Sequence, residues 1–193
     1  TQITKMKNIA IFAYGSGTNA EEIIKKFQNS TKAKVVLVVC NNPNAKVIER
    51  ASNYKIPVFI SKDKTTYSSD VFLQMLMVAF RVDLIVLAGY LWLIPEILVK
   101  AFPKKIINLH PALLPDYGGK GMYGDKVHKA VLKNKERETG ITIHYVNENY
   151  DEGNIIYQES FVIEPLETTL GLANKIHKLE HAIYPTVIEQ LIS

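Results

Sequence analysis

The chain has 193 residues, of which 47% are hydrophobic and 22% charged, and this balance indicates a globular protein rather than a disordered or fibrous one. One cysteine excludes an internal disulfide framework. The polar start Thr1–Asn8 and the lack of any run near the roughly 18 apolar residues of a membrane span predict a cytoplasmic protein without a membrane partner. The net charge of +4 favours phosphates and carboxylates as ligands, whereas the scattered lysines give no support for nucleic-acid binding.

Apolar runs of strand length alternate with amphipathic runs of helix length over the first 110 residues. The expected strands are Asn8–Tyr14, Lys34–Cys40, Val58–Ile60, Leu84–Ala88 and Ile106–Leu109, and the expected helices are Asn19–Gln28, Ala45–Tyr54, Tyr67–Arg81 and Glu96–Phe102. Strands that are apolar throughout are typical of a parallel sheet covered on both faces. The pattern therefore predicts a Rossmann-like α/β fold whose ligands lie at the carboxyl ends of the strands.

The pattern changes after residue 135. Two β-rich runs, Ile141–Val146 and Ile155–Ile163, are separated by a turn at Asn149–Gly153, and we expect them to form an antiparallel pair at the edge of the sheet. A last helix is predicted from about Thr169, with a kink or interruption at Pro185, because proline lacks the backbone donor and clashes with the preceding turn. With no linker or repeat, residues 1–193 are expected to form a single domain.

The first predicted strand is followed by the glycine-rich loop Gly15-Ser16-Gly17-Thr18-Asn19-Ala20, which opens a helix. Glycines allow an anion to approach the backbone closely, and a helix N-terminus offers unpaired N–H groups. The G-x-G-x-x-A spacing also occurs in dinucleotide-binding proteins, but no acidic residue lies between Glu22 and Glu49 to bind a ribose. A single phosphate is the better ligand, and the alternative is a simple glycine turn.

A candidate catalytic pair lies at the end of the fifth predicted strand. Asn108 and His110 are two residues apart, so their side chains share one face of the strand. The amide can donate to a developing oxyanion and the imidazole can move a proton near neutral pH, which suits acyl transfer to an amine. Asp151, in the later turn, would fix the tautomer of His110 if it reached it. Taken alone, the pair is a weak signal and is better explained as a capped strand end with a packed histidine.

Six segments, in order along nearly the whole chain, carry a resemblance to the folate-dependent formyltransferase family. They are Gly15-Ser16-Gly17-Thr18-Asn19, Leu87-Ala88-Gly89-Tyr90, Asn108-Leu109-His110-Pro111-Ala112-Leu113-Leu114-Pro115, Gly140-Ile141-Thr142-Ile143-His144, Tyr150-Asp151-Glu152-Gly153 and Glu180-His181-Ala182-Ile183-Tyr184-Pro185. The strand-end segment is shared by folate formyltransferases generally. The C-terminal segment resembles the members that act on glycinamide ribonucleotide.

The resemblance implies the formyltransferase fold and transfer of a formyl group from 10-formyltetrahydrofolate to the amine of glycinamide ribonucleotide in purine biosynthesis. It implies small-molecule substrates only, no metal, and a monomer or weak homodimer. The implied site residues are Asn108, His110 and Asp151 for catalysis, Gly17, Thr18, Asn19 and Glu180 for the ribonucleotide, and Leu87, Leu91, Trp92, Leu93, Ile94 and Asn108 for the folate.

Two features depart from the family pattern. Trp92 stands where well-known members have an arginine, so folate contacts there are expected to differ. The loop from Gly118 to Gly124 is longer, and it is either a glycine-hinged lid or a plain surface loop. The histidines outside the motif lack metal-ligand spacing. His144 is interpreted as a structural histidine on a strand, while the role of His181 is left open.

Two other kinds of function remain as alternatives. One is another folate formyl enzyme, acting on a sugar nucleotide or methionyl-tRNA or hydrolysing formyltetrahydrofolate. The tRNA enzyme and the hydrolase would be expected to carry a further domain, for which 193 residues leave no room. The other is a non-catalytic phosphate- or nucleotide-binding protein, which would explain the glycine loop but not the convergence of Asn108, His110 and Asp151.

Overall fold

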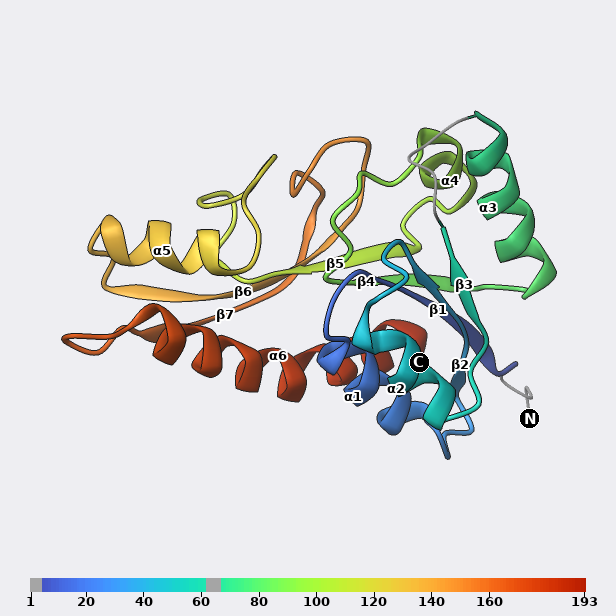
Figure 1. The fold of residues 1–193 in the computed structure, drawn as a ribbon, viewed down its shortest axis with the longest axis horizontal. Helices are drawn as coiled ribbons and strands as arrows, with labels where there is room; N and C mark the ends of the chain where they lie inside the picture. Colours follow the sequence, from blue (N-terminus) through green and yellow to red (C-terminus); the bar gives the residue numbers. More distant parts are fainter. Residues whose placement is uncertain (1–4, 62–66) are drawn as a thin grey trace.

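The computed structural model describes residues 5–61 and 67–193 and contains a sheet with the strand order β3-β2-β1-β4-β5-β6-β7 (Figure 1). Residues 1–4 of the polar start considered above lie outside the described part. The strands are β1 (Lys7–Ala13), β2 (Ala33–Cys40), β3 (Val58–Ile60), β4 (Leu84–Ala88), β5 (Ile106–His110), β6 (Glu138–Tyr145) and β7 (Ile155–Val162). The helices are α1 (Thr18–Phe27), α2 (Lys46–Asn53), α3 (Tyr67–Ala79), α4 (Glu96–Ala101), α5 (Asp125–Lys133) and α6 (Thr169–Ile192).

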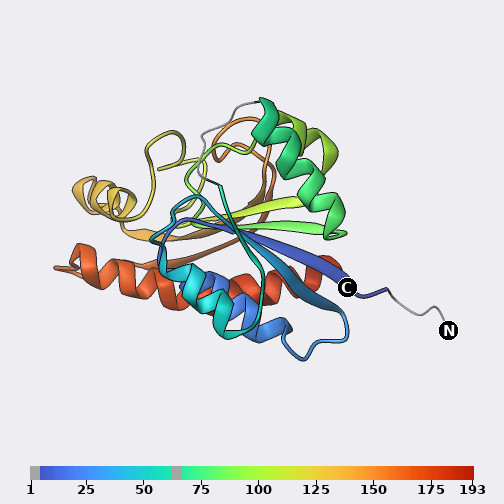
Figure 2. The ribbon, with the colours of Figure 1, turned by 45° about the vertical axis from the view of Figure 1, so that its right-hand side comes forward.

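The first five strands are parallel, as their apolar composition predicts. Helices α1, α2 and α6 cover one face of the sheet, and α3 and α4 cover the other (Figures 1 and 2). The two largest clusters of buried side chains lie on opposite faces, one with Phe27 and Tyr184 on the side of α1 and α6, and one with Met77 and Leu98 on the side of α3 and α4. The sheet is therefore the middle of three layers, and the carboxyl ends of its parallel strands meet at one edge.

Strands β6 and β7 are antiparallel to each other, as predicted, but only β7 lies at the edge of the sheet. β6 pairs with β5 on its other side, also antiparallel, with Asn108 opposite His144 and His110 opposite Thr142. β6 also begins at Glu138, three residues before the predicted start at Ile141. The earlier start follows from burial, because Thr139 and Gly140 pack under β7, where a Cβ at Gly140 would lie 1.8 Å from the Glu159 carbonyl oxygen.

The predicted interruption at Pro185 is wrong, because α6 continues through it as one helix of 24 residues. Tertiary contacts hold the helix on both sides of the proline. Tyr184 is fully buried, and its hydroxyl donates to the carbonyl oxygens of Leu87 (2.8 Å) and Ile107 (3.4 Å). Pro185, Val187 and Ile188 are buried as well, so packing on the sheet outweighs the one backbone hydrogen bond that proline removes.

Helix α5 is an element for which the sequence pattern led to no prediction. Val127 and Val131 are four residues apart on its buried face and pack against Leu172 near the start of α6. The helix is only nine residues long, and lysines surround its two valines, so its amphipathic signal is short. Its first turn directly follows the loop of residues 118–124, so the position of α5 holds that loop near the strand ends.

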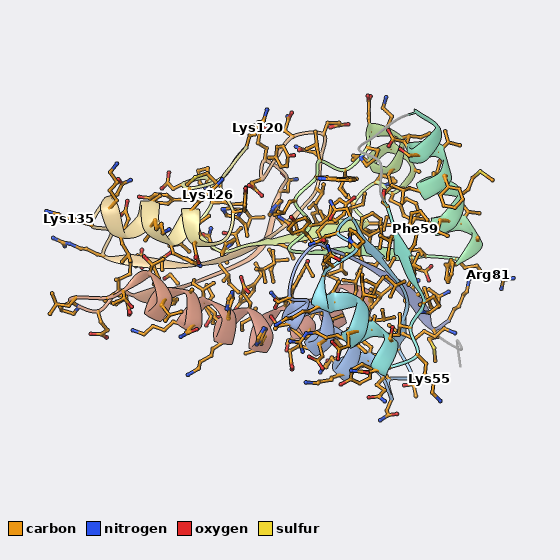
Figure 3. All side chains as sticks on the ribbon, viewed as in Figure 1. Lys55, Phe59, Arg81, Lys120, Lys126 and Lys135 are labelled. Carbon is orange, nitrogen blue, oxygen red and sulfur yellow. The ribbon has the colours of Figure 1, made fainter. Side chains whose placement is uncertain are left out.

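The basic side chains lie at separate places on the molecule. Figure 3 shows Lys120, Lys126 and Lys135 on the side of α5, and Arg81 and Lys55 on other borders. This distribution fits the modest net charge of +4 and the scattered lysines of the sequence. Among the described residues, no helix combines the length and the apolar character that crossing a membrane requires.

Candidate active site

A cavity of about 730 Å³ lies at the carboxyl ends of β1, β4 and β5. This is the edge at which an open parallel sheet presents ligands. The segments 14–19, 87–94 and 108–111, which directly follow or end these strands, form one part of its wall. The wall is completed by residues 119–124 of the second glycine-containing loop, the turn residues 149–151, and His128, His144, Val146, His177 and Glu180. Every residue that the sequence predicted for catalysis, phosphate binding or folate binding lines this cavity.

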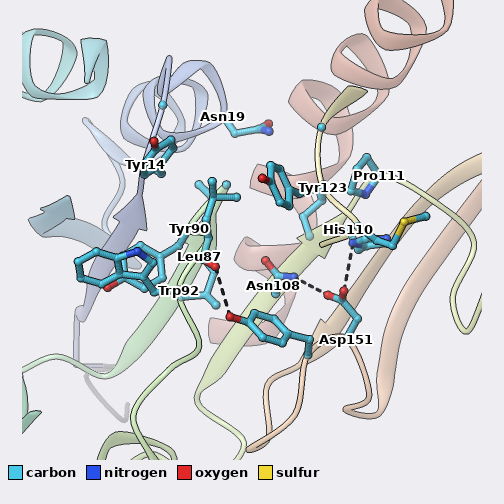
Figure 4. A pocket seen from close by; sticks show the side chains of 18 of the residues that line it. Tyr14, Asn19, Leu87, Tyr90, Trp92, Asn108, His110, Pro111, Tyr123 and Asp151 are labelled. Carbon is cyan, nitrogen blue, oxygen red and sulfur yellow. Dashed lines mark hydrogen bonds and ion pairs between the residues drawn. The ribbon is translucent and has the colours of Figure 1, made fainter. Parts of the chain in front are cut away.

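Asp151 is the centre of the polar group in the cavity (Figure 4). It has a left-handed backbone with φ of 57°, which is uncommon for a residue with a side chain and turns its carboxylate back toward β5. One carboxylate oxygen, Oδ2, accepts from the Gly119 N–H at 3.0 Å and lies 3.5 Å from His110 Nδ1. The other oxygen, Oδ1, lies 3.4 Å from Asn108 Nδ2 and 3.5 Å from His144 Nε2. A single carboxylate therefore joins β5, β6 and the loop of residues 118–124.

The hydrogen bonds of His110 define its tautomer. Its Nε2 lies 2.7 Å from the Tyr117 carbonyl oxygen, which can only accept, so Nε2 carries the proton. Nδ1 then faces Asp151. Burial is the largest influence on the pKa of His110 and lowers it, while the Asp151 carboxylate and the Tyr117 carbonyl act in the opposite direction. The imidazole is therefore neutral near pH 7, with Nδ1 ready to accept a proton beside a carboxylate that would stabilise the resulting charge.

The carboxyl group of Asp151 is ionised in this setting. Burial is the largest single influence and raises its pKa, but the contacts with His144, His110 and the Gly119 N–H together outweigh burial and lower the pKa below its usual range. An ionised carboxylate beside His110 can stabilise a proton on that imidazole. This arrangement favours proton transfer at the strand end.

His144 belongs to this group, although the sequence indicated only a structural histidine. It is 2% exposed, and its Nδ1 donates to the Tyr145 carbonyl oxygen at 2.9 Å, which leaves Nε2 to accept from Asn108 Nδ2 at 3.1 Å. The pairing of β5 with β6 places the two residues directly opposite each other. No local signal could have revealed this contact, because it depends on the register between strands 36 residues apart.

The first glycine loop, Gly15 to Ala20, lies at the end of the cavity next to α1, with its backbone close to α2. Gly17 is the N-cap of α1 and has φ of 74°. A Cβ added at this position would lie 2.5 Å from the side chain of Val47. Only glycine fits this conformation and this approach. No side chain caps the first N–H groups of α1, so those of Thr18 and Asn19 are available to an anion at the helix N-terminus.

Glu180, on α6, reaches the same loop from the opposite side of the cavity. Its Oε2 accepts from Asn19 Nδ2 at 2.8 Å, and only 5% of the residue is exposed. Burial raises the pKa of Glu180 to about 7, and the hydrogen bond from Asn19 opposes that rise. The Asn19 Oδ1 atom is buried with no hydrogen-bond partner among the described residues. These two side chains therefore offer polar atoms to a ligand that reaches the loop.

Glu180→Gln tests this burial through stability. In the unfolded chain the carboxyl group has its ordinary pKa of 4.5, and in the native protein the pKa is about 7, so the native state binds more protons between these values. The wild type should therefore lose stability relative to the variant as pH rises through this window, by about 3 kcal/mol in total. Urea unfolding of both proteins at pH 4.5 and pH 8 measures the difference. A difference that is the same at both pH values would contradict it.

The segment after β4 forms an apolar and aromatic wall. Leu87 and Ile94 are buried, while Leu93 is 40% exposed at the rim. Tyr90 and Trp92 lie edge to face with ring centroids 6.3 Å apart. Leu91, the remaining residue predicted for the folate, lines the cavity too. The wall suits a flat, partly apolar ligand and offers backbone groups for its polar edge.

The loop from Gly118 to Gly124 borders the cavity and is tied to the catalytic group through the Gly119 N–H. Tyr123 stands beside the cavity in Figure 4, and Lys126 Nζ lies 3.1 Å from its hydroxyl oxygen. His128 and His177 also line this part, although no role was expected for either from the sequence. His128 Nδ1 is buried without a partner among the described residues.

Comparison with known proteins agrees with the fold. Residues 7–188 match the family model described as formyl transferase. The chain is 41% identical to phosphoribosylglycinamide formyltransferase of Bacillus subtilis over 97% of this chain and 95% of that protein. It is also 41% identical to the chloroplastic enzyme of that name from Arabidopsis thaliana, of which it spans 65%. The crystal structure of phosphoribosylglycinamide formyltransferase from Bacillus halodurans superposes with a TM-score of 0.89 at 35% identity, over 97% of this chain and 96% of that one. The chain therefore belongs to the formyl transferase family.

Proposed function

We propose that this protein transfers the formyl group of 10-formyltetrahydrofolate to the amine of glycinamide ribonucleotide, a step of purine biosynthesis. The observation that carries the proposal is one cavity that contains the loop before α1 at one end and the aromatic wall after β4 at another. Asn108, His110 and Asp151 lie between them. The relatives that carry the ribonucleotide enzyme's name match this chain over nearly all of its length. Residues 1–193 would act as one catalytic domain in the cytoplasm, as a monomer or weak homodimer.

Each end of the cavity would bind one of the two substrates. Gly17, Thr18 and Asn19 would hold the phosphate through the N–H groups at the start of α1, and Glu180 would accept hydrogen bonds from the ribonucleotide. The wall of Leu87, Leu91, Trp92, Leu93 and Ile94, with Asn108, would receive the folate. Trp92 offers a ring face rather than a charge, so it would pack against an aromatic part of the folate. The amine and the formyl group then meet beside β5.

The chemistry follows from the state of His110. The amine nitrogen attacks the formyl carbon, a new C–N bond forms, and negative charge develops on the formyl oxygen. His110 Nδ1 accepts the proton that the amine loses, and the imidazolium is stabilised by Asp151, 3.5 Å away. As the bond between the formyl carbon and folate N10 breaks, that proton passes to N10. The proton count therefore balances without any further reactant.

Asn108 would supply the hydrogen bond to the developing oxyanion. Both N–H directions of its amide are engaged, one toward His144 at 3.1 Å and one toward Asp151 at 3.4 Å. The second contact is the longer and weaker, so it is the one that a substrate oxygen would replace. The shorter contact with His144 would then keep the amide plane in place, which makes the donor preorganised.

An assay with the purified chain tests the proposal. Glycinamide ribonucleotide and 10-formyltetrahydrofolate are mixed with the protein, and release of tetrahydrofolate is followed by absorbance. We expect turnover that requires the ribonucleotide. Folate consumption without it would indicate a formyltetrahydrofolate hydrolase instead. Binding of either substrate without turnover would favour a non-catalytic binding protein.

A further inference from the structure

The carbonyl oxygens of Gly15, Ser16 and Gly17, in the loop proposed to bind the phosphate, all accept hydrogen bonds from α1 or α2. The Gly15 oxygen accepts from the Val47 N–H at 3.3 Å, and the Gly17 oxygen accepts from the Glu21 N–H inside α1 at 2.9 Å. The Ser16 oxygen accepts from Nε of Arg50 at 2.8 Å. A carbonyl oxygen that turned inward would repel a bound phosphate. Two of these three contacts come from α2, so α2 is the support on which the loop is built.

Arg50 makes a second contact that concerns charge. Glu21 is the acidic residue in the first turn of α1, the turn whose N–H groups face the loop. Its carboxylate would oppose a phosphate at that position if it were unpaired. The Arg50 Nη1 atom pairs with Glu21 Oε2, and the two side chains are only 31% and 19% exposed, so the pair is less screened than a fully exposed one.

We propose that Arg50 is a positioning residue for the substrate phosphate, which it assists without touching it. Nε holds the Ser16 carbonyl outward so that the N–H groups of the loop face the cavity, and Nη1 neutralises the carboxylate of Glu21 in the first turn of α1. The proposal rests on the function proposed above, in which the loop binds the phosphate of the ribonucleotide. It adds a residue outside every motif by which the sequence indicated the site.

The shape of the guanidinium explains why arginine is needed. Its Nε and Nη1 donors lie in one plane at fixed angles, and here they serve a carbonyl oxygen and a carboxylate at the same time. A lysine has one ammonium group at the end of a flexible stem and would satisfy one of the two partners well. Arg50→Lys should therefore retain the charge and lose the alignment.

Steady-state kinetics of Arg50→Met, with Arg50→Lys beside it, tests the proposal. We expect Arg50→Met to raise KM for glycinamide ribonucleotide about tenfold, equivalent to about 1.4 kcal/mol, with kcat and KM for the folate unchanged. Arg50→Lys should fall between the two proteins. The double variant Glu21→Gln/Arg50→Met should recover part of the loss, because it removes the carboxylate that Arg50 neutralises. Lys25→Met is the matched control, since Lys25 lies on the same helix as Glu21 and pairs with Glu22 instead.

Direct binding separates the two proposals. Calorimetric titration with the ribonucleotide and with its dephosphorylated nucleoside should show the effect of Arg50→Met on the phosphorylated ligand alone. If the wild type does not bind the ribonucleotide, the proposed function fails whatever the variants do. If the wild type binds it and Arg50→Met binds it equally well, the role of Arg50 is overturned. Equal losses for both ligands, or a double variant no better than Arg50→Met, would indicate a merely structural role and overturn it as well.

Discussion

Replacing His110 by alanine is expected to lower kcat for formyl transfer by about 10²–10⁴, the usual contribution of a positioned acid–base group. The variant loses the imidazole at the end of β5, whose unprotonated Nδ1 lies 3.5 Å from the Asp151 carboxylate. KM for either substrate should change little, because Nδ1 accepts a proton during the reaction and is not expected to hold either substrate in the ground state. Stopped-flow or steady-state absorbance with saturating ribonucleotide and folate measures the loss.

The pH profile of the wild type provides the internal check on His110. The reaction needs a neutral imidazole, and burial lowers the pKa of His110 from its ordinary value of 6.5. The kcat, measured with both substrates saturating so that titration of Glu180 does not act through binding, should therefore hold as pH falls to 6.5, where an ordinary histidine is half protonated, and should decline only at lower pH. His110→Ala should lack this decline. His181→Ala serves as the control, since His181 is not among the residues that line the cavity. A wild-type rate that halves at or above pH 6.5 would contradict the assignment.

Asn108→Ala is expected to reduce kcat and kcat/KM together by about 10²–10³, the effect of losing one oxyanion donor. The two constants should fall equally because the oxygen carries its charge only in the transition state. Asn108→Asp should be at least as impaired, since it sets a carboxylate where negative charge develops and beside Asp151.

The matched comparison for Asn108 is His144→Gln. Asn108 Nδ2 donates to His144 Nε2, and a glutamine oxygen can accept in its place, although less rigidly. A partial loss of kcat is expected, smaller than that of Asn108→Ala. Melting temperatures of all variants show whether the fold is intact. If Asn108→Ala instead raised KM with kcat unchanged, Asn108 would bind the ground state and the oxyanion role would be wrong.

The sequence by itself determined those features whose physical basis is local. Continuous apolar runs predicted the five parallel strands, because a strand buried on both faces needs no polar alternation. The period of two along a strand placed Asn108 and His110 on one face, and both line the cavity. The spacing of Gly15 and Gly17 before a helix predicted a turn with close backbone approach, and Gly17 has the left-handed φ of 74°.

Only the tertiary structure decided which distant residues join these local features. The antiparallel register of β6 against β5 sets His144 opposite Asn108, the turn at Asp151 reaches both, and the packing of α2 and α6 brings Arg50 and Glu180 to the glycine loop. Each of these contacts depends on sheet register or helix packing, neither of which leaves a period in the local sequence. Packing likewise carries α6 through Pro185, because the area buried around Tyr184 outweighs a local preference to stop.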